Sequence, residues 1–455
     1  MSAVAETALG LVGETPLVRV SGFDTGPCDL WLKLENQNPG GSIKDRIAIS
    51  MIAAAEREGR LGGDRRHLVE ATAGNTGLGL ALVAARRGYR LTLVVPDKMS
   101  REKVLHLRAL GAEVVTTRSD VVKGHPDYYQ DLAERLARES GAFYVNQFAN
   151  PANPLAHETG TGPEIARQME GRLDAMVCGV GSGGTLTGLS RFFARALPDC
   201  EMVLADPEGS VLAGYVRTGR LGVAGSWLVE GIGEDFLPPI CDLSRVGRAY
   251  SISDAESFQA ARQLLRYTGI LAGSSSGTLL AAALRYCREQ RVPRRVCTLV
   301  CDTGNKYLSK MYDQSWLEAQ GLAGSTPGAT SDLLARPGRP GSSAWLRPGD
   351  TLREAALRLR RLGLSALPVA EGGHILGVVT ESHVLEAVLG GGAALDRPAT
   401  DAMASRFGTV SPRTPLRELV PLLEASDVAI VAEGAELLGV VTRLDVLDHL
   451  RAARS

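Results

Sequence analysis

Three glycine-containing segments of this 455-residue chain carry residue types that bind anions or react with carbonyl groups. The first, QNPGGSIKDR, places Lys44 directly after two glycines and a serine. Ser42 could cap a helix that begins near Ile43, so that Lys44 would lie in its first turn. The positive end of a helix dipole disfavours an ammonium group, which predicts a lowered pKa for Lys44. Such a lysine suits Schiff-base chemistry, whereas the ordinary alternative is a solvated surface charge.

The second segment, EATAGNTGLGLA, leads from an apolar run into a helical one. Backbone N–H groups and short hydroxyls at a helix N-terminus can bind a carboxylate. The candidates are Thr72, Ala73, Asn75 and Thr76. The alternative is an ordinary N-cap turn, which Asn75 or Thr76 would provide equally well.

The third segment, GVGSGGTLTG, could wrap a phosphate with its backbone N–H groups. Its candidates are Gly181, Ser182, Gly183, Gly184 and Thr185. The same segment matches GxGxxG, and Asp206 follows about one βα unit later, as in a dinucleotide site. A nicotinamide-binding site would leave Lys44 and TAGNTG unexplained, so we favour a compact phosphate cup.

Alternating elements are predicted to position these segments from residue 30 to about 305. The strand candidates are LWLKLE, HLVEAT, LTLVVP, EVVTT, FYVNQF, AMVCGV, MVLADP and CTLVCD. Stretches such as IAISMIAAAEREG and TGLGLALVAARRG have helical spacing and a terminal glycine. Several strands are apolar without alternation, which is typical of a sheet covered on both faces. The pattern predicts an α/β fold with mainly parallel strands and a ligand site at their carboxyl ends.

The composition excludes several classes of protein. Fifty basic and 51 acidic residues give a net charge of −1, which argues against a nucleic-acid or membrane partner. No apolar run is long enough to span a membrane and no signal peptide is visible, so we expect a cytoplasmic protein. Cys297 and Cys301 are the one close pair among seven cysteines. No zinc-like spacing occurs, so we expect reduced thiols and no metal site.

A change in composition divides the chain. We predict one domain over residues 1–318 and a Gly-, Pro- and Ser-rich linker over 319–343 with one short helix. Residues 344–455 contain a repeat, in which ILGVVTESHVLEAV returns as LLGVVTRLDVLDHL 62 residues later. Two copies, at about 344–392 and 398–455, predict a pseudo-twofold tandem module.

The ordered set GGSIKDR, TAGNTG, GSGGT and GILAGSSSG resembles the fold-type-II pyridoxal-phosphate enzymes, whose fold is like that of tryptophan synthase β. More narrowly, residues 8–315 resemble the cysteine synthase and cystathionine β-synthase family. The resemblance implies that Lys44 binds pyridoxal 5′-phosphate covalently and that the Gly181–Thr185 loop holds the cofactor phosphate. Asn75 would bond the 3′-oxygen of the ring. Ser275 would face the ring nitrogen, its alternative role being another helix N-cap.

The implied reaction is a β-replacement. Lys44 would remove the α-proton of a bound amino acid, the β-substituent would leave, and a thiol would add. The residues implied to bind the substrate carboxylate are Thr72, Ala73, Asn75, Thr76 and Gln147. Ala73 stands where many relatives have serine, which removes one hydroxyl contact.

The stretch VEGIGEDFLPP resembles the cystathionine β-synthase branch, which uses serine and homocysteine. Glu230 could steer or protonate the leaving hydroxyl, or receive the amino group of homocysteine, and Asp235 would join the substrate site. Glu234 stands where eukaryotic relatives often have tyrosine, and Phe148 fits the cysteine-synthase pattern. An O-acetylserine-dependent cysteine synthase therefore remains an open alternative. The same chemistry would release hydrogen sulfide from cysteine plus homocysteine.

The tail resembles a Bateman module, the pair of CBS domains found on enzymes of this type. Thr442 and Asp445 match the motif that binds a ribose, whereas the first copy pairs Thr380 with His383. This implies one site for S-adenosylmethionine or an adenine nucleotide, or a purely structural module. We expect a homodimer or homotetramer and no haem. A nucleotide sensor with a degenerate catalytic domain is disfavoured, because the candidate cofactor residues are intact.

Overall fold

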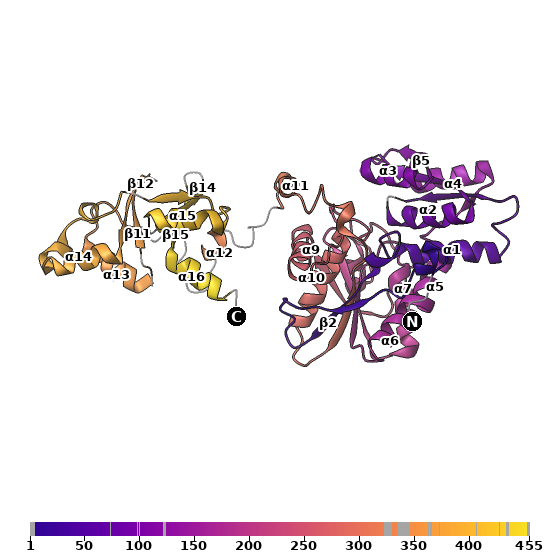
Figure 1. Cartoon of the computed structure of the whole chain (residues 1–455), viewed down its shortest axis with the longest axis horizontal. Helices are drawn as coiled ribbons and strands as arrows, with labels where there is room; N and C mark the ends of the chain where they lie inside the picture. The colour runs from indigo at the N-terminus through magenta and orange to yellow at the C-terminus, as the bar shows by residue number, and fades with distance from the viewer. Residues whose placement is uncertain are drawn as a thin grey trace. The chain divides into compact units, whose positions relative to one another are not determined.

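The computed structural model describes residues 5–322, 330–334 and 345–452, apart from positions 73, 98, 100, 122, 123, 363, 365, 373, 406, 427, 434 and 435. Ala73, a predicted substrate contact, lies outside the described residues. The chain forms two compact units, Met1–Leu322 and Ala323–Ser455, which we call the N-terminal and C-terminal units (Figure 1). No helix in the described ranges is long and apolar enough to cross a membrane.

The larger sheet of the N-terminal unit has six strands in the order β1-β2-β10-β7-β8-β9. Every neighbouring pair is parallel except β1 and β2. In chain order, the strands are β1 (Leu17–Arg19), β2 (Asp29–Lys33), β7 (Ala175–Cys178), β8 (Glu201–Pro207), β9 (Val246–Ile252) and β10 (Arg295–Leu299). All four residues of β7 are buried, as the continuous apolar run predicted for a strand covered on both faces.

A second, fully parallel sheet has the order β5-β4-β3-β6. Its strands are β3 (His67–Ala71), β4 (Arg90–Pro96), β5 (Glu113–Thr117) and β6 (Phe143–Tyr144). Figure 1 shows helices α2, α3 and α4 gathered around this sheet. The helices of the unit are α1 (Lys44–Arg57), α2 (Asn75–Arg87), α3 (Arg101–Ala109), α4 (Tyr129–Ser140), α5 (Ala152–Ala156), α6 (Gly162–Gln168), α7 (Gly184–Ala196), α8 (Leu212–Thr218), α9 (Asp254–Thr268), α10 (Ser274–Arg288) and α11 (Gln314–Ala319). The α/β class with mainly parallel strands is confirmed.

The sequence did not predict the two edge strands of the larger sheet. β1 has only three residues, none of them buried, and β9 has only exposed and half-buried positions before its final isoleucine. Edge strands lack a second neighbour, so the apolar signal that revealed the central strands is weak in both. The strand predicted from FYVNQF is likewise reduced to the two residues of β6.

The repeat in the C-terminal unit is visible in its geometry. β11 (Ala366–Glu371) and β12 (His374–Thr380) form a hairpin with a bulge after Val369. β14 (Val428–Glu433) and β15 (Glu436–Thr442) repeat it 62 residues later, with the bulge after Val431. The remaining elements are α12 (Thr330–Leu334), α13 (Leu352–Leu362), α14 (Glu381–Leu389), β13 (Gly408–Val410), α15 (Leu416–Ser426) and α16 (Arg443–Ala452).

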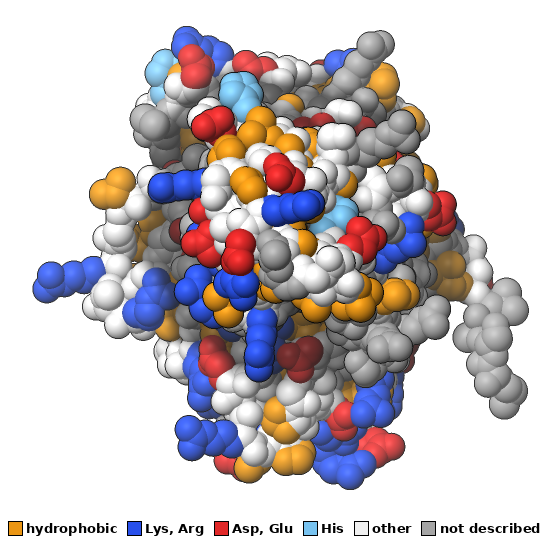
Figure 2. Space-filling view, turned by 90° about the vertical axis from the view of Figure 1, so that its left-hand side faces the viewer, with side chains coloured by type: hydrophobic (Ala, Val, Ile, Leu, Met, Phe, Trp, Pro, Cys, Tyr) orange, Lys and Arg blue, Asp and Glu red, His pale blue; other side chains and the backbone are white. Residues whose placement is uncertain are grey.

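Apolar residues join the two repeats and leave one face exposed. Ala366, Val378, Val428 and Ile430 form a buried cluster that takes residues from both hairpins. Helix α12, within the stretch predicted as linker, places Leu333 in the core of the second repeat. Figure 2 shows hydrophobic side chains among charged ones on the end of the unit that carries α13 and α14. The exposed leucines and valine there are Leu357, Leu385, Val388 and Leu389.

The contact between α9 and α10 provides a test of the packing. A Cβ atom added at Gly277 would lie 1.9 Å from the carbonyl oxygen of Ser257, whereas one added at Gly214 in α8 would meet nothing within 4 Å. We expect Gly277→Ala to lower the free energy of unfolding by about 1–3 kcal/mol or more. Gly214→Ala should raise it by about 0.5–1 kcal/mol, because it reduces the entropy of the unfolded chain. Urea unfolding of both variants measures this; equal effects would contradict the packing.

Candidate active site

A cavity of about 690 Å³ opens where the carboxyl ends of strands from both sheets of the N-terminal unit face one another. Most of the predicted site residues line it: Lys44, Thr72, Asn75, Thr76, Gln147, Gly181, Ser182, Gly183, Thr185, Glu230 and Ser275. Phe148 and Glu234 line it as well. Gly184 lies behind the wall at the start of α7, and the exposed Asp235 is not among the lining residues. The predicted contact of Asp235 with a substrate therefore has no support in this geometry.

Lys44 is the first residue of α1 and lines the cavity. The N-cap position is Ile43 and not Ser42, although the Ser42 hydroxyl accepts a hydrogen bond from the backbone N–H of Lys44 at 3.2 Å. Burial lowers the pKa of Lys44, and it outweighs the opposing influence of Cys301, Glu234 and Asp302. The direction agrees with the prediction, but its largest cause is burial, which the sequence did not reveal. The amine is thereby suited to act as a base or nucleophile near neutral pH.

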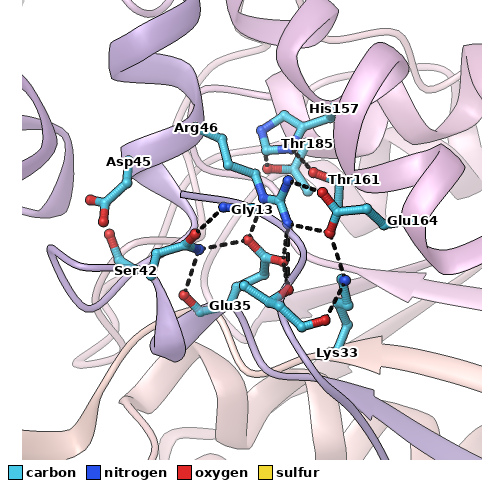
Figure 3. Close-up of polar contacts among 12 residues, drawn as sticks. Gly13, Lys33, Glu35, Ser42, Asp45, Arg46, His157, Thr161, Glu164 and Thr185 are labelled. Carbon is cyan, nitrogen blue, oxygen red and sulfur yellow. Dashed lines mark hydrogen bonds and ion pairs between the residues drawn. The ribbon is translucent and has the colours of Figure 1, made fainter. Parts of the chain in front are cut away.

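A buried network of charges fixes the first turn of α1 (Figure 3). Arg46 donates from Nε to Glu35 at 2.6 Å and from Nη1 to Glu164 at 2.7 Å. Lys33 contacts the same Glu164 at 2.7 Å and is itself fully buried. Burial alone would raise the pKa of Glu164, but hydrogen bonds from Arg46 lower it to about 2. The network balances two cations with two anions and anchors the turn that carries Lys44.

The loop before α7 fits a phosphate group. Backbone N–H groups of Gly181, Ser182 and Gly183 have no acceptor within the described part of the chain. A Cβ atom added at Gly181 would lie 2.5 Å from the carbonyl oxygen of Gly231. One added at Gly184 would lie 1.9 Å from Oδ1 of Asn153. Gly183 has a φ of 90°, a conformation that favours glycine. The glycines thus bring free N–H groups and a helix N-terminus to the cavity wall, which is an anion site.

Two residues that the sequence did not single out hold the side chains of this loop. Asn153 donates to the Ser182 hydroxyl at 2.9 Å and to the backbone carbonyl of Gln147 at 2.7 Å. The Thr185 hydroxyl lies 3.2 Å from Nε2 of His157, which is fully buried. Burial, with Arg46 and Lys44 nearby, lowers the pKa of His157 well below its usual value, so the imidazole is neutral. Neither residue belongs to a glycine motif, so local sequence carried no signal for them.

Asn75 begins α2 and is held from two sides. Its Nδ2 donates to Asp302 at 2.8 Å, and its Oδ1 accepts from Lys306 at 2.5 Å. Asp302 is buried three residues after the end of β10 and also accepts from the Tyr307 hydroxyl at 2.7 Å. One N–H of the Asn75 amide remains for a ligand in the cavity. Sequence reasoning missed Asp302, although an acid closing the apolar run CTLVCD is a usable signal.

Three consecutive serines at the start of α10 have separate partners. Ser274 accepts from the backbone N–H of Glu230 at 2.9 Å, and Ser276 accepts from that of Cys301 at 2.9 Å. Ser275 lies between them and is the one of the three that lines the cavity. The N-cap of α10 is Gly273, so Ser275 does not serve as the predicted alternative N-cap.

The predicted carboxylate site lies at the N-terminus of α2. The Thr76 hydroxyl donates to Oε1 of Gln147 at 2.7 Å, and Nε2 of Gln147 lies 3.5 Å from Glu70. Burial raises the pKa of Glu70 to about 8. Thr72, Thr76 and Gln147 therefore present polar groups to the cavity beside the start of α2, where the first N–H groups of a helix have no partner within it.

Glu230 is paired with two lysines from distant parts of the chain. Lys103 of α3 forms a short ion pair with it, and Lys310 contacts it at 2.7 Å. Burial alone would raise the pKa of Glu230, but these lysines lower it below its usual value. A carboxylate in this state cannot supply a proton at neutral pH. Of the predicted roles, proton donation is disfavoured, whereas steering of the leaving hydroxyl and binding of an ammonium group remain predictions.

The dinucleotide and nucleoside motifs have local partners. Asp206 is buried and accepts from the backbone N–H of Ala213 at 2.7 Å, and it does not line the cavity. Asp445 accepts from the backbone N–H and the hydroxyl of Thr442, both at 2.8 Å. His383 makes the equivalent contact with the backbone N–H of Thr380 at 3.2 Å. Both copies of the repeat therefore brace the start of a helix.

Comparison with known proteins connects this geometry to a family. A family model of pyridoxal-phosphate dependent enzymes matches residues 8–302, and the CBS domain model matches residues 342–390 and 399–452. The chain is 35% identical to the cystathionine β-synthase of Dictyostelium discoideum, with 98% of this chain and 92% of that protein covered. The identity to the Oryctolagus cuniculus enzyme is 36%, with 97% and 84% covered. The chain belongs to the cystathionine β-synthase family of pyridoxal-phosphate-dependent enzymes.

Solved structures of proteins similar in sequence agree with the fold. An O-acetylserine dependent cystathionine β-synthase from Helicobacter pylori has a TM-score of 0.62 at 34% identity, covering 68% of this chain and 98% of its own. A hydrogen sulfide-producing enzyme from Fusobacterium nucleatum has a TM-score of 0.60 at 33% identity, covering 67% and 100%. The fold-type-II class, the dependence on pyridoxal phosphate and the presence of CBS domains are thereby confirmed.

The buried network predicts a large effect of one substitution. Arg46→Met leaves Glu35 and Glu164 buried without their shared partner, which should cost about 3–5 kcal/mol of unfolding free energy. Arg172→Met removes the partner of Glu170 from an exposed pair and should change stability by less than about 1 kcal/mol. Chemical unfolding monitored by far-UV circular dichroism compares them. A small effect of Arg46→Met would contradict the anchoring role of the network.

Proposed function

We propose that this enzyme is a cystathionine β-synthase, which condenses L-serine with L-homocysteine to cystathionine and water. The observation that carries the proposal is the set of Lys103, Glu230 and Lys310 at the cavity. The set combines one carboxylate with two ammonium groups, and it faces the same cavity as Lys44. A second substrate with both an α-ammonium and an α-carboxylate can pair with both charges, whereas sulfide has neither group.

Pyridoxal phosphate supplies the electron sink that acidifies the α-C–H bond and allows a β-substituent to leave. Lys44 would hold the cofactor covalently. The N–H groups of the Gly181–Thr185 loop would bind its phosphate, which the glycine geometry supports. The free N–H of Asn75 would meet the 3′-oxygen, and the Ser275 hydroxyl would face the ring nitrogen.

The first substrate would bind with its carboxylate at the start of α2. Thr72 and Thr76 supply hydroxyls there, and Gln147 supplies an amide that Thr76 and Glu70 orient. The amine of Lys44, released on substrate binding, would take the α-proton. Its lowered pKa favours this role, because a protonated amine could not accept the proton.

An O-acetylserine-dependent enzyme is the second candidate. It is favoured by the similarity to the Helicobacter pylori enzyme and by Phe148, which packs against Phe236 at a centroid distance of 5.9 Å. Release of hydrogen sulfide when cysteine replaces serine follows from the same chemistry, and the Fusobacterium nucleatum relative supports it.

In the C-terminal unit, Thr442 and Asp445 would bind S-adenosylmethionine or an adenine nucleotide. The exposed leucines of α13 and α14 support assembly into a homodimer or homotetramer.

The test measures cystathionine from serine plus homocysteine beside cysteine from O-acetylserine plus sulfide. We expect the first reaction, and we expect Glu230→Gln to raise the KM for homocysteine about tenfold, since one charged contact is worth about 1.5–3 kcal/mol. The KM for serine should change little. Glu318→Gln, at an exposed site, is the control. A product only from O-acetylserine, or equal changes in both KM values, would contradict the assignment.

A further inference from the structure

Glu234 is a second acid at the cavity, and its backbone is held in place. Its N–H donates to the Ser210 hydroxyl at 3.0 Å, and its carbonyl accepts from that hydroxyl at 3.1 Å and from the N–H of Val211 at 3.0 Å. The preceding Gly233 has a φ of 90°. Three hydrogen bonds and a constrained turn therefore fix where the side chain begins, and it lines the cavity together with Lys44.

The surroundings of Glu234 differ from those of Glu230. No described residue donates a hydrogen bond to the Glu234 carboxyl, whereas Glu230 contacts two lysines. The ionisable groups near Glu234 are Lys44 and Tyr129, which line the cavity, and Tyr128, Asp206, Asp235 and Cys241, which do not. One of these is a cation and two are carboxylic acids.

This environment favours the neutral acid. Burial raises the pKa of Glu234 to about 8, Asp235 and Asp206 add to the effect, and Lys44 opposes it. The carboxyl group is therefore protonated below about pH 8. Glu230 is ionised over the same range because its lysines lower its pKa. Two acids in one cavity thus carry opposite protonation states, which is how acid and base roles are commonly divided.

We propose that Glu234 is the acid that protonates the leaving hydroxyl of serine and the base that then accepts the proton of the incoming thiol. This inference rests on the proposed function and deepens it, because hydroxide is a poor leaving group and acetate is not. It gives the role that the sequence assigned to Glu230 to a neighbour four residues later.

The step balances in atoms and electrons. Lys44 takes the α-proton, the Cβ–O bond breaks with its electron pair, and the hydroxyl leaves as water with the proton from Glu234. The thiol sulfur then forms the Cβ–S bond, its proton passes to the Glu234 carboxylate, and Lys44 returns the α-proton. Serine and a thiol become a thioether and water without oxidation or reduction, and both residues end in their starting states.

The first experiment compares leaving groups in Glu234→Gln, which has nearly the same shape but cannot donate an acidic proton. With serine plus homocysteine we expect kcat to fall by about 10²–10⁴-fold. O-acetylserine plus sulfide needs no proton at the leaving group and no base for the attacking HS⁻, so its rate should stay within about fivefold. β-Chloroalanine replaces O-acetylserine if the latter is not consumed. Glu234→Asp should restore part of the serine activity, and Glu208→Gln, at an exposed position, is the control.

The pH profile adds a readout that a merely structural role would not move. Since the acid form is required, the serine rate of the unsubstituted enzyme should decline as pH rises above about 8. The rate with O-acetylserine should lack that decline. Difference infrared spectroscopy provides evidence independent of turnover. Glu70 and Glu234 should each give a protonated carboxylic C=O band that titrates near this pH, and Glu234→Gln should remove one of the two.

Equal losses on both leaving groups in Glu234→Gln would overturn the inference, as would unchanged serine turnover or carboxylic C=O bands that the substitution leaves unchanged. These outcomes leave the proposed function standing, because the unsubstituted enzyme still makes cystathionine from serine. An unsubstituted enzyme that consumes only O-acetylserine would overturn the proposed function and this inference together.

Discussion

The position of Arg46 between Glu35 and Glu164 is the constraint on which the active site depends. The network joins β2, through Lys33, the turn after it and α1 to α6, which lies more than 100 residues further along the chain. Buried ion pairs often contribute little net stability, since desolvation offsets their attraction. Their effect here is positional: Arg46 lies two residues after Lys44, so the first turn of α1 cannot shift without separating buried charges. The reactive amine is held at the cavity by contacts that lie outside it.

Neighbouring charges also distinguish Glu230 from Glu234, the two acids at the cavity. Glu230 and Glu234 are four residues apart in one loop, but Glu230 faces the ammonium groups of Lys103 and Lys310, whereas Glu234 faces one lysine and several acids. Burial acts on both, and the neighbouring charges decide the sign of the shift. One loop thereby offers a carboxylate for binding and a neutral acid for proton transfer, while the fixed backbone around Ser210 keeps the second in place.

The sequence allowed the α/β class, the tandem repeat and most of the cavity lining to be predicted, because each depends on local patterns. Glycine loops between a strand and a helix meet at the carboxyl ends of parallel strands, so their residues converge whatever the details of the sheets. The edge strands β1 and β9 were missed because exposed strands have weak apolar signals. His157 and Asn153 were missed because their roles arise from contacts across the fold, whereas Asp302 was missed although it closes an apolar run. The two lysines that disfavour proton donation by Glu230 could not be foreseen either, since they are more than 70 residues away in the chain.

Covalent trapping tests the central claim, that this architecture makes Lys44 the lysine that binds the cofactor. Borohydride reduction of the enzyme isolated with pyridoxal phosphate converts the lysine linkage into a stable amine, and peptide mass spectrometry locates the added mass. We expect a single modified peptide that contains Lys44, and none with the cofactor on Lys103, Lys306 or Lys310. A modification on one of these lysines, or an enzyme that binds the cofactor without a reducible linkage, would contradict it.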